Sequence, residues 1–175
     1  MKVLAIQFKY LGDAVILTPA LKALVNQTPN IELHVLVAAE IAPLLENLPW
    51  IAKVWAMPRQ RSKVKLSHAL PFIKSLRQEK FDQSIDFGGN DRGALLSYLS
   101  GAKIRFGSTD ITHPKWIQKF CYSKIIRRIN PNAPYFDLHF ELLSALNISR
   151  PNQLKLEIEF GSSEVETASK FIVTS

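Results

Sequence analysis

Short apolar runs alternate along the chain with longer segments in which apolar residues recur at helical spacing. The short runs predict strands near residues 2–8, 32–37, 53–57, 82–87, 103–107 and 154–158. The longer segments predict helices near residues 13–26, 40–48, 68–80, 91–100, 115–129 and 135–146. Because strands that alternate with helices are typical of βαβ units, the pattern predicts an α/β fold with a parallel sheet and helices on both faces.

Prolines mark where the first two predicted helices end. The first ends before Thr28-Pro29 and the second before Pro49, because proline disfavours helical geometry in the residue that precedes it. Pro19 lies inside the first helix, where it removes an amide donor and crowds the preceding carbonyl. We expect a kink or a loosened turn there.

Size and composition indicate one globular domain. The chain has 175 residues, of which 47% are apolar. No apolar stretch reaches the length of a membrane span and the N-terminus lacks the layout of a signal peptide, so we expect a cytoplasmic protein. A single cysteine, Cys121, excludes an intramolecular disulfide and is predicted to be a small buried apolar residue.

The net charge of +7, from 22 Lys and Arg against 15 Asp and Glu, favours a polyanionic partner. Nucleic acid, an anionic membrane surface and a phosphorylated glycolipid all have the required charge, and a solvated basic surface needs no partner. A basic amphipathic stretch within the helix predicted at 115–129 suits either an anionic membrane surface or packing on the core with a basic outer face.

The first strand leads directly into the most informative feature, Gly12-Asp13 at the start of a helix. A carboxylate at this point lies at the carboxyl edge of the sheet, where open α/β folds bind ligands. Asp13 is either a helix N-cap or a general base for a hydroxyl group, and the two roles are compatible, because a capping geometry also keeps the carboxylate ionised.

Several segments resemble one protein family. KVLAIQFKYLGDAVILTPALKAL and NIELHVLVAAEIAPLLENLPWIAKVWAMP are similar to the first half of the bacterial lipopolysaccharide heptosyltransferases, the ADP-heptose glycosyltransferases of glycosyltransferase family nine. The Gly-Asp element and Thr18-Pro19-Ala20-Leu21 carry the likeness, which FDQSIDFGGNDRGALLSYLSGAKIRFG extends. HPKWIQKFCYSKI and YFDLHFELLSALNI are most similar to the branch that adds the third heptose of the inner core.

The resemblance implies a Rossmann-like domain, the N-terminal, acceptor-binding half of a GT-B glycosyltransferase. Residues 1–160 would form this half, and 161–175 would begin the link to a donor domain that the chain lacks. The implied reaction is inverting transfer of heptose from ADP-heptose to the lipopolysaccharide inner core, with Asp13 as general base and without a metal or other cofactor. The implied location is the cytoplasm, with contact at the cytoplasmic face of an anionic inner membrane.

Candidate acceptor contacts lie in the loops at the same edge as Asp13. The loop after the third strand carries Arg59, Arg61 and Lys63, which suit phosphates or acidic sugars, although a basic loop is often only solvated. The remaining candidates are Lys9, Tyr10 and Gly12 before the first helix, and Asn90 and Arg92 after the fourth strand.

Each of these residues also has a purely structural interpretation. Lys9 is either a solvated lysine or a partner for an acceptor phosphate, and Asn90 is a natural helix cap. No histidine spacing suits a metal, and His34 and His139 are predicted to be structural.

Two other functions stay open. One is a non-catalytic module that keeps only the acceptor surface. The other is a nucleic-acid-binding domain, which only the charge favours. Since the chain has no RNA-module motif and no helix-turn-helix signature, we expect no nucleic acid.

Overall fold

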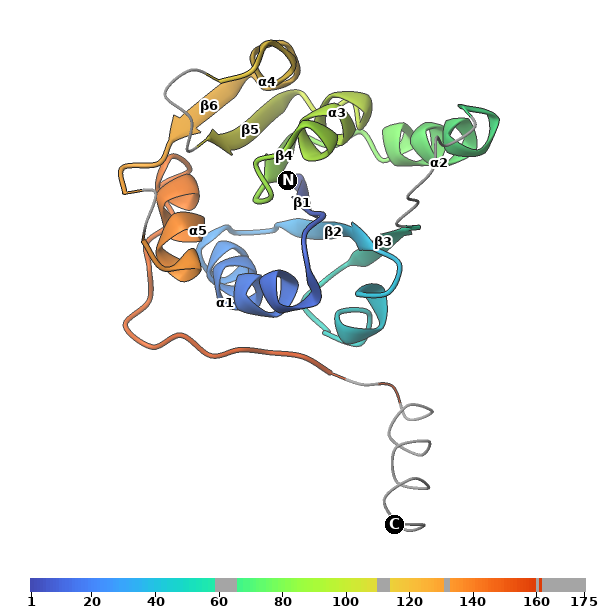
Figure 1. Ribbon diagram of the computed structural model, residues 1–175. Helices are drawn as coiled ribbons and strands as arrows, with labels where there is room; N and C mark the ends of the chain where they lie inside the picture. Colours follow the sequence, from blue (N-terminus) through green and yellow to red (C-terminus); the bar gives the residue numbers. More distant parts are fainter. Residues whose placement is uncertain (59–65, 110–113, 131–132, 160, 162–175) are drawn as a thin grey trace, which may run out of the picture.

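Six parallel strands form the centre of the computed structural model, in the spatial order β3-β2-β1-β4-β5-β6 (Figure 1). The strands are β1 (Lys2–Gln7), β2 (Glu32–Ala38), β3 (Lys53–Met57), β4 (Gln83–Asp86), β5 (Ile104–Thr109) and β6 (Lys124–Arg127). The helices are α1 (Leu11–Gln27), the 3-10 helix η1 (Ala42–Leu44), α2 (Leu66–Gln78), α3 (Asp91–Leu99), α4 (Trp116–Cys121) and α5 (Tyr135–Ser144). The structure describes residues 1–58, 66–109, 114–130, 133–159 and 161, without the side chains of 66–69.

Helices cover both faces of the sheet. Figure 1 shows α2, α3 and α4 on one face and α1, η1 and α5 on the other. The central strand β1 pairs with β2 on one side and β4 on the other, and its residues Val3 to Ile6 are completely buried. A strand buried on both faces must be apolar throughout, which explains the unbroken apolar run at the start of the sequence. The predicted α/β class with a parallel sheet is confirmed.

The prediction of one long helix over residues 115–129 is wrong. Helix α4 ends at Cys121, and the chain returns as β6, in which Ile125 and Ile126 pair with Gly107 and Ser108 of β5. β-Branched residues favour a strand, and a sixth strand extends the sheet beyond β5.

Two further predicted elements differ in the structure. The helix expected at 40–48 is only the 3-10 helix η1 with flanking turns, and it carries Pro43 in its first turn. The strand expected at 154–158 does not form. This segment instead crosses α1, where the Glu157 amide donates to the Thr18 hydroxyl at 3.0 Å.

Thr18 also explains how α1 contains a proline. Pro19 has no N–H to donate to the carbonyl of Val15, four residues earlier. The Thr18 hydroxyl donates to that carbonyl at 2.8 Å and so replaces the missing hydrogen bond. α1 therefore runs through Pro19 from Leu11 to Gln27.

Among the residues that the structure describes, no helix combines the length and the apolar character needed to span a membrane.

Candidate functional site

The candidate site lies where the direction of chain progression across the sheet reverses. After β1 the chain moves through α1 to β2 on one side, and after β4 it moves through α3 to β5 on the other. In open parallel sheets, the two loops at such a reversal run in opposite directions. They generally leave a crevice outside the carboxyl ends of the strands. The loops after β1 and β4, with the first turns of the helices that follow them, carry most of the predicted site residues, including Asp13, Asn90 and Arg92.

Asp13 occupies the third position of α1. Its Oδ2 accepts a hydrogen bond from the amide of Tyr10, the residue that precedes the helix, at 2.9 Å. The side chain is partly exposed, and among the described residues it has no other hydrogen bond or ion pair. Asp13 is therefore fixed through one carboxylate oxygen, which leaves Oδ1 available to another molecule.

This geometry corrects the expectation that Asp13 begins the helix or caps it. The helix begins at Leu11, and Gly12 lies within its first turn. Tyr10 occupies the cap position and is 75% exposed. A carboxylate at the third helical position that bonds back to the cap amide is one half of a capping box, and it also suits the positive end of the helix dipole.

Gly12 has open space around it. A side chain added at this position would meet no atom of the described residues within 4 Å. The surface beside Asp13 is therefore accessible to a ligand.

Arg92 connects three loops at this edge of the sheet. Its guanidinium lies 4.4 Å from the centre of the Phe8 ring, after β1, and donates to the carbonyl of Pro58, after β3, at 3.2 Å. Arg92 itself belongs to α3, which follows β4. The predicted basic loop begins directly after Pro58, but Arg59, Arg61 and Lys63 lie outside the described residues.

Two further cations lie at the same edge. The Lys9 ammonium is 5.2 Å from the centre of the Tyr135 ring on α5. Its charge opposes the rise that burial causes in the pKa of Asp86 and adds to the fall that burial causes in the pKa of His139. Arg128 follows β6, and its charge also lowers the pKa of His139. The sequence pattern placed Arg128 on a helix and gave no sign that it reaches this edge.

Asn90 caps α3, as its interpretation as a helix cap predicts. Its side-chain oxygen accepts from the Gly93 amide at 2.9 Å. The chain reaches this cap through Gly89, whose φ of +62° favours glycine. A side chain at Gly93 would collide with the Asp86 carboxylate, so the start of α3 packs directly on that group.

Asp86, at the end of β4, is the buried acid beneath these loops. Its Oδ1 accepts from the Gly88 amide at 2.9 Å, and its Oδ2 accepts from the Tyr122 hydroxyl at 2.5 Å. Complete burial raises the pKa of Asp86 to about 6, against the opposing effect of these donors. The Tyr122 ring packs on Gly107, where a side chain would overlap it.

Two other buried polar side chains surround the reversal point. Within the described part of the chain, Gln7 at the end of β1 and His139 on α5 have no hydrogen-bond partner for their side-chain nitrogen and oxygen atoms. Gln7 lies under Gly88, and His139 lies edge-on to Phe87 with ring centres 5.5 Å apart. Burial lowers the pKa of His139 to about 4, so this histidine is neutral at pH 7.

One cluster has atoms close enough to hold a metal ion, but lysines already fill it. The ligand atoms of Glu32, His34 and Glu79 lie within 4.8 Å of one another. Lys2 pairs with both carboxylates, at 3.0 and 2.7 Å. The Nδ1 atom of His34 accepts from the Trp55 indole at 3.1 Å, which confirms the structural role predicted for this histidine.

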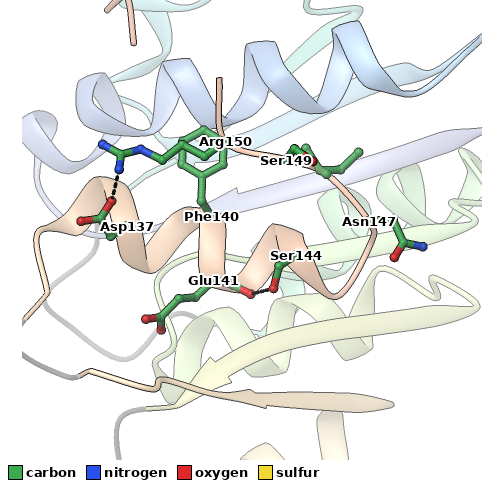
Figure 2. A pocket seen from close by; sticks show the side chains of 8 residues that line it. Asp137, Phe140, Glu141, Ser144, Asn147, Ser149 and Arg150 are labelled. Atoms are coloured by element: carbon green, nitrogen blue, oxygen red, sulfur yellow. Dashed lines mark hydrogen bonds and ion pairs between the residues drawn. The ribbon is translucent and has the colours of Figure 1, made fainter. Parts of the chain in front are cut away.

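A groove along α5 is separate from this site. It has a volume of about 630 Å³, and Figure 2 shows the ion pair between Asp137 and Arg150 across it, at 3.0 Å. On the helix side the Ser144 hydroxyl donates to the Glu141 carbonyl at 2.7 Å (Figure 2). None of the predicted site residues that the structure describes lines this groove.

Comparison with known proteins gives two relatives in sequence. A protein of Haemophilus influenzae described as a putative glycosyltransferase is 27% identical over 127 residues, which cover 73% of this chain and 35% of the relative. Lipopolysaccharide heptosyltransferase 3 of Escherichia coli is 24% identical over 119 residues, which cover 65% of this chain and 35% of that protein. No family model matches the chain.

Solved structures share the fold. A glycosyl transferase family 9 protein of Veillonella parvula superposes with a TM-score of 0.82 at 16% identity, over 99% of this chain and 49% of its own. Escherichia coli heptosyltransferase WaaC with ADP-2-deoxy-2-fluoro heptose gives a TM-score of 0.73 at 19% identity, over 87% of this chain and 50% of its own.

The chain is similar to glycosyltransferases. The likeness in sequence is to a putative glycosyltransferase and a heptosyltransferase, and the likeness to the solved structures is in the Rossmann-like α/β fold. The chain spans about a third of the length of these sequence relatives and about half of these structural neighbours.

Proposed function

We propose that this chain is the acceptor-binding half of a heptosyltransferase that acts on the lipopolysaccharide inner core, with residues 1–160 as the domain and 161–175 as the start of the interdomain link. The observation that carries the proposal is the Asp13 carboxylate at the reversal point of the sheet, held by one backbone amide with its second oxygen available. A general base needs an ionised oxygen within reach of the acceptor hydroxyl.

The cations at the carboxyl edge of the sheet support a phosphorylated acceptor. Lys9, Arg92 and Arg128 belong to the loops and helix starts after β1, β4 and β6, and guanidinium groups suit phosphate and carboxylate geometry. The basic loop with Arg59, Arg61 and Lys63 is proposed to add to this surface, because Pro58 in front of it contacts Arg92. Tyr10, Gly12 and Asn90 complete the proposed acceptor surface.

Similarity to lipopolysaccharide heptosyltransferase 3 supports the third heptose of the inner core as the transferred sugar. The donor, ADP-heptose, is proposed to bind a second domain, and the structural neighbour WaaC, solved with ADP-2-deoxy-2-fluoro heptose, supports a donor of this class. The proposal includes no metal or other cofactor, so transfer should persist in excess chelator. It also implies a cytoplasmic enzyme.

The test is a steady-state transfer assay with the chain joined to a donor-binding domain, ADP-heptose as donor and a truncated lipopolysaccharide as acceptor. Asp13→Asn should lower kcat by roughly 10²- to 10⁴-fold with little change in acceptor KM, because only proton transfer in the transition state is lost. The matched control is Asp91→Asn, since Asp91 is an acid at the same edge that pairs with Lys115 at 3.1 Å. Normal turnover in Asp13→Asn would exclude the general-base role.

A second candidate, a binding module without catalysis, would keep the same acceptor surface. It predicts normal acceptor binding and no transfer even when a donor domain is supplied.

A further inference from the structure

An aromatic and basic surface covers the outer side of α3 and α4, away from the sheet. Trp116 and Phe120 are 78% and 62% exposed, and they lie four residues apart, on the same side of α4. The Phe120 ring contacts Tyr98 of α3, with ring centres 5.1 Å apart, and Leu95 lies one turn before Tyr98. We call these four residues and the cations around them the α3–α4 surface.

Cations surround these exposed rings. The Arg105 guanidinium lies over Tyr98, 5.6 Å from the ring centre, and Lys119 lies between Trp116 and Phe120 in the sequence of α4. Lys119 is exposed and has no ion-pair partner in the described part of the chain. Lys115 at the start of the helix adds a further positive charge, which Asp91 partly balances.

The surface continues into an apolar groove between α2 and α3. Leu70, Ile73 and Leu99 line this groove, which has a volume of about 650 Å³. Lys74, Arg77 and Lys80 stand around it. The three helices α2, α3 and α4 lie on one face of the sheet (Figure 1). They therefore present exposed apolar side chains with cations around them on that face.

An anionic lipid bilayer has the chemistry that matches this surface. Tryptophan and phenylalanine enter the interfacial region of a bilayer, while lysine and arginine extend their stems over apolar surface and keep their charges at the headgroups. Single-stranded nucleic acid also pairs cations with aromatic rings, but its bases stack on aromatic rings and gain little from an aliphatic groove. The aliphatic side chains of the α2–α3 groove therefore favour lipid.

We propose that the α3–α4 surface and the adjoining α2–α3 groove bind the chain to an anionic membrane surface. A chain bound to the membrane in this way would also hold the candidate site near a lipid-linked acceptor. The reason is that α4 lies beside the candidate site, where the Gln118 side chain donates to the Gly89 carbonyl at 3.1 Å. The candidate site at the carboxyl edge of the sheet would then lie beside the headgroups. Membrane binding itself does not depend on the proposed transferase activity.

The test is co-sedimentation of the 175-residue chain with vesicles of phosphatidylglycerol and phosphatidylcholine, compared with vesicles of phosphatidylcholine alone. The wild-type chain should bind the anionic vesicles and hardly bind the neutral ones, more weakly as salt rises. The double variant Lys119→Gln, Phe120→Ser should lower the partition coefficient by roughly 10- to 100-fold, since it removes one cation and one interfacial ring.

The matched control is Lys155→Gln, Leu156→Ser. This pair is also an exposed lysine followed by an exposed apolar residue, but it lies in the segment that crosses α1, on the opposite face. The control variant should bind anionic vesicles like the wild type. Trp116→Ser is a second test variant, because Phe120→Ser also removes the ring contact with Tyr98. Its partition coefficient to anionic vesicles should fall by a similar factor.

Equal binding to both kinds of vesicle, equal losses in the test and control variants, or a preference for a single-stranded oligonucleotide over anionic vesicles would each overturn the proposal. Binding of a soluble phosphorylated oligosaccharide by the same variants separates the two proposals. The α4 variants should still bind the oligosaccharide. If the proposed function is wrong, the wild-type chain will not bind the oligosaccharide either.

Discussion

At the scale of single residues, the hydrogen bond between Asp86 and Tyr122 stabilises the buried layer beneath the loops of the candidate site. Burial raises the pKa of Asp86 to about 6 from an ordinary value of 3.8. Between these two values the unfolded chain has already released the proton that the folded chain retains, so the Asp86 contribution to stability falls as pH rises from about 4 to 6. The Tyr122 hydroxyl and the Gly88 amide offset this cost, because they hydrogen-bond the ionised form.

Tyr122→Phe should therefore destabilise the fold more at high pH than at low pH. At pH 8 the loss should be about 1.5–3 kcal/mol, as for a hydrogen bond to a charged group, and at pH 5 about 1 kcal/mol, because the carboxyl is then mostly protonated. Urea unfolding at the two pH values measures the difference. A loss that is equal at both would show that Tyr122 contributes only packing.

His139 should have the opposite pH dependence. Its pKa is about 4 when folded and 6.5 ordinarily, so the unfolded chain gains a proton first as pH falls, and stability is lost between about 6.5 and 4. His139→Phe keeps a ring beside Phe87 and removes this titration. Relative to the wild type, the variant should gain about 2 kcal/mol between pH 7.5 and pH 5, measured by denaturant unfolding. A constant difference would mean that His139 titrates normally.

The sequence pointed to some site residues and not to others, depending on the range of the contacts. The strand, loop and helix around Asp13 are local, so its place at the sheet edge follows from neighbouring residues. The bond between Asp86 and Tyr122 joins residues 36 apart, and it forms only because α4 is short and Tyr122 leads into β6. No pattern of neighbouring residues encodes that pairing.

At the scale of secondary-structure elements, α1 depends on Thr18. Its hydroxyl donates to the carbonyl that Pro19 leaves without a partner, and it accepts from the Glu157 amide in the segment that crosses the helix. The Glu157 carboxylate in turn accepts from the Trp50 indole at 2.8 Å and pairs with Lys22 at 3.5 Å. Thr18 thus connects α1, which carries Asp13, to the segment around Glu157.

Thr18→Val should lower the free energy of unfolding by about 1–3 kcal/mol, because the partly buried Val15 carbonyl and Glu157 amide both lose a partner while the volume stays nearly constant. It should also speed hydrogen exchange at the Glu157 amide. Thr18→Ser, which keeps the hydroxyl, should restore most of both properties. If the valine variant matches the wild type in stability, the hydroxyl has no such role.

Elements were predicted well where an apolar run fits only a strand and poorly where it also fits a helix. The ranges of β1 and β2, and of the edge strand β3, follow their apolar runs closely. β6 has only a few residues and a basic flank on each side, so its isoleucines fit a helical period equally well. Only pairing with β5 makes the strand the more stable state.

At the scale of the whole molecule, the order of the strands in the sheet determines which residues meet at the candidate site. Reversal between β1 and β4 brings Asp13 and Arg92 to the same edge of the sheet, although they are far apart in sequence, and Arg92 contacts Phe8 after β1 and Pro58 after β3. The α/β class could be predicted from the alternation of elements, whereas the position of Arg128 at this edge required the sixth strand.

The most direct test of the acceptor-binding role is calorimetric titration of the 175-residue chain with three ligands at two salt concentrations. The chain should bind a phosphorylated inner-core oligosaccharide, lose most of that binding when the oligosaccharide is dephosphorylated, and hardly bind ADP-heptose, because charge-assisted contacts to phosphate supply the affinity. Arg92→Gln should weaken acceptor binding roughly tenfold. Tight binding of ADP-heptose, or a preference for an oligonucleotide with a steep salt dependence, would contradict the acceptor-binding role.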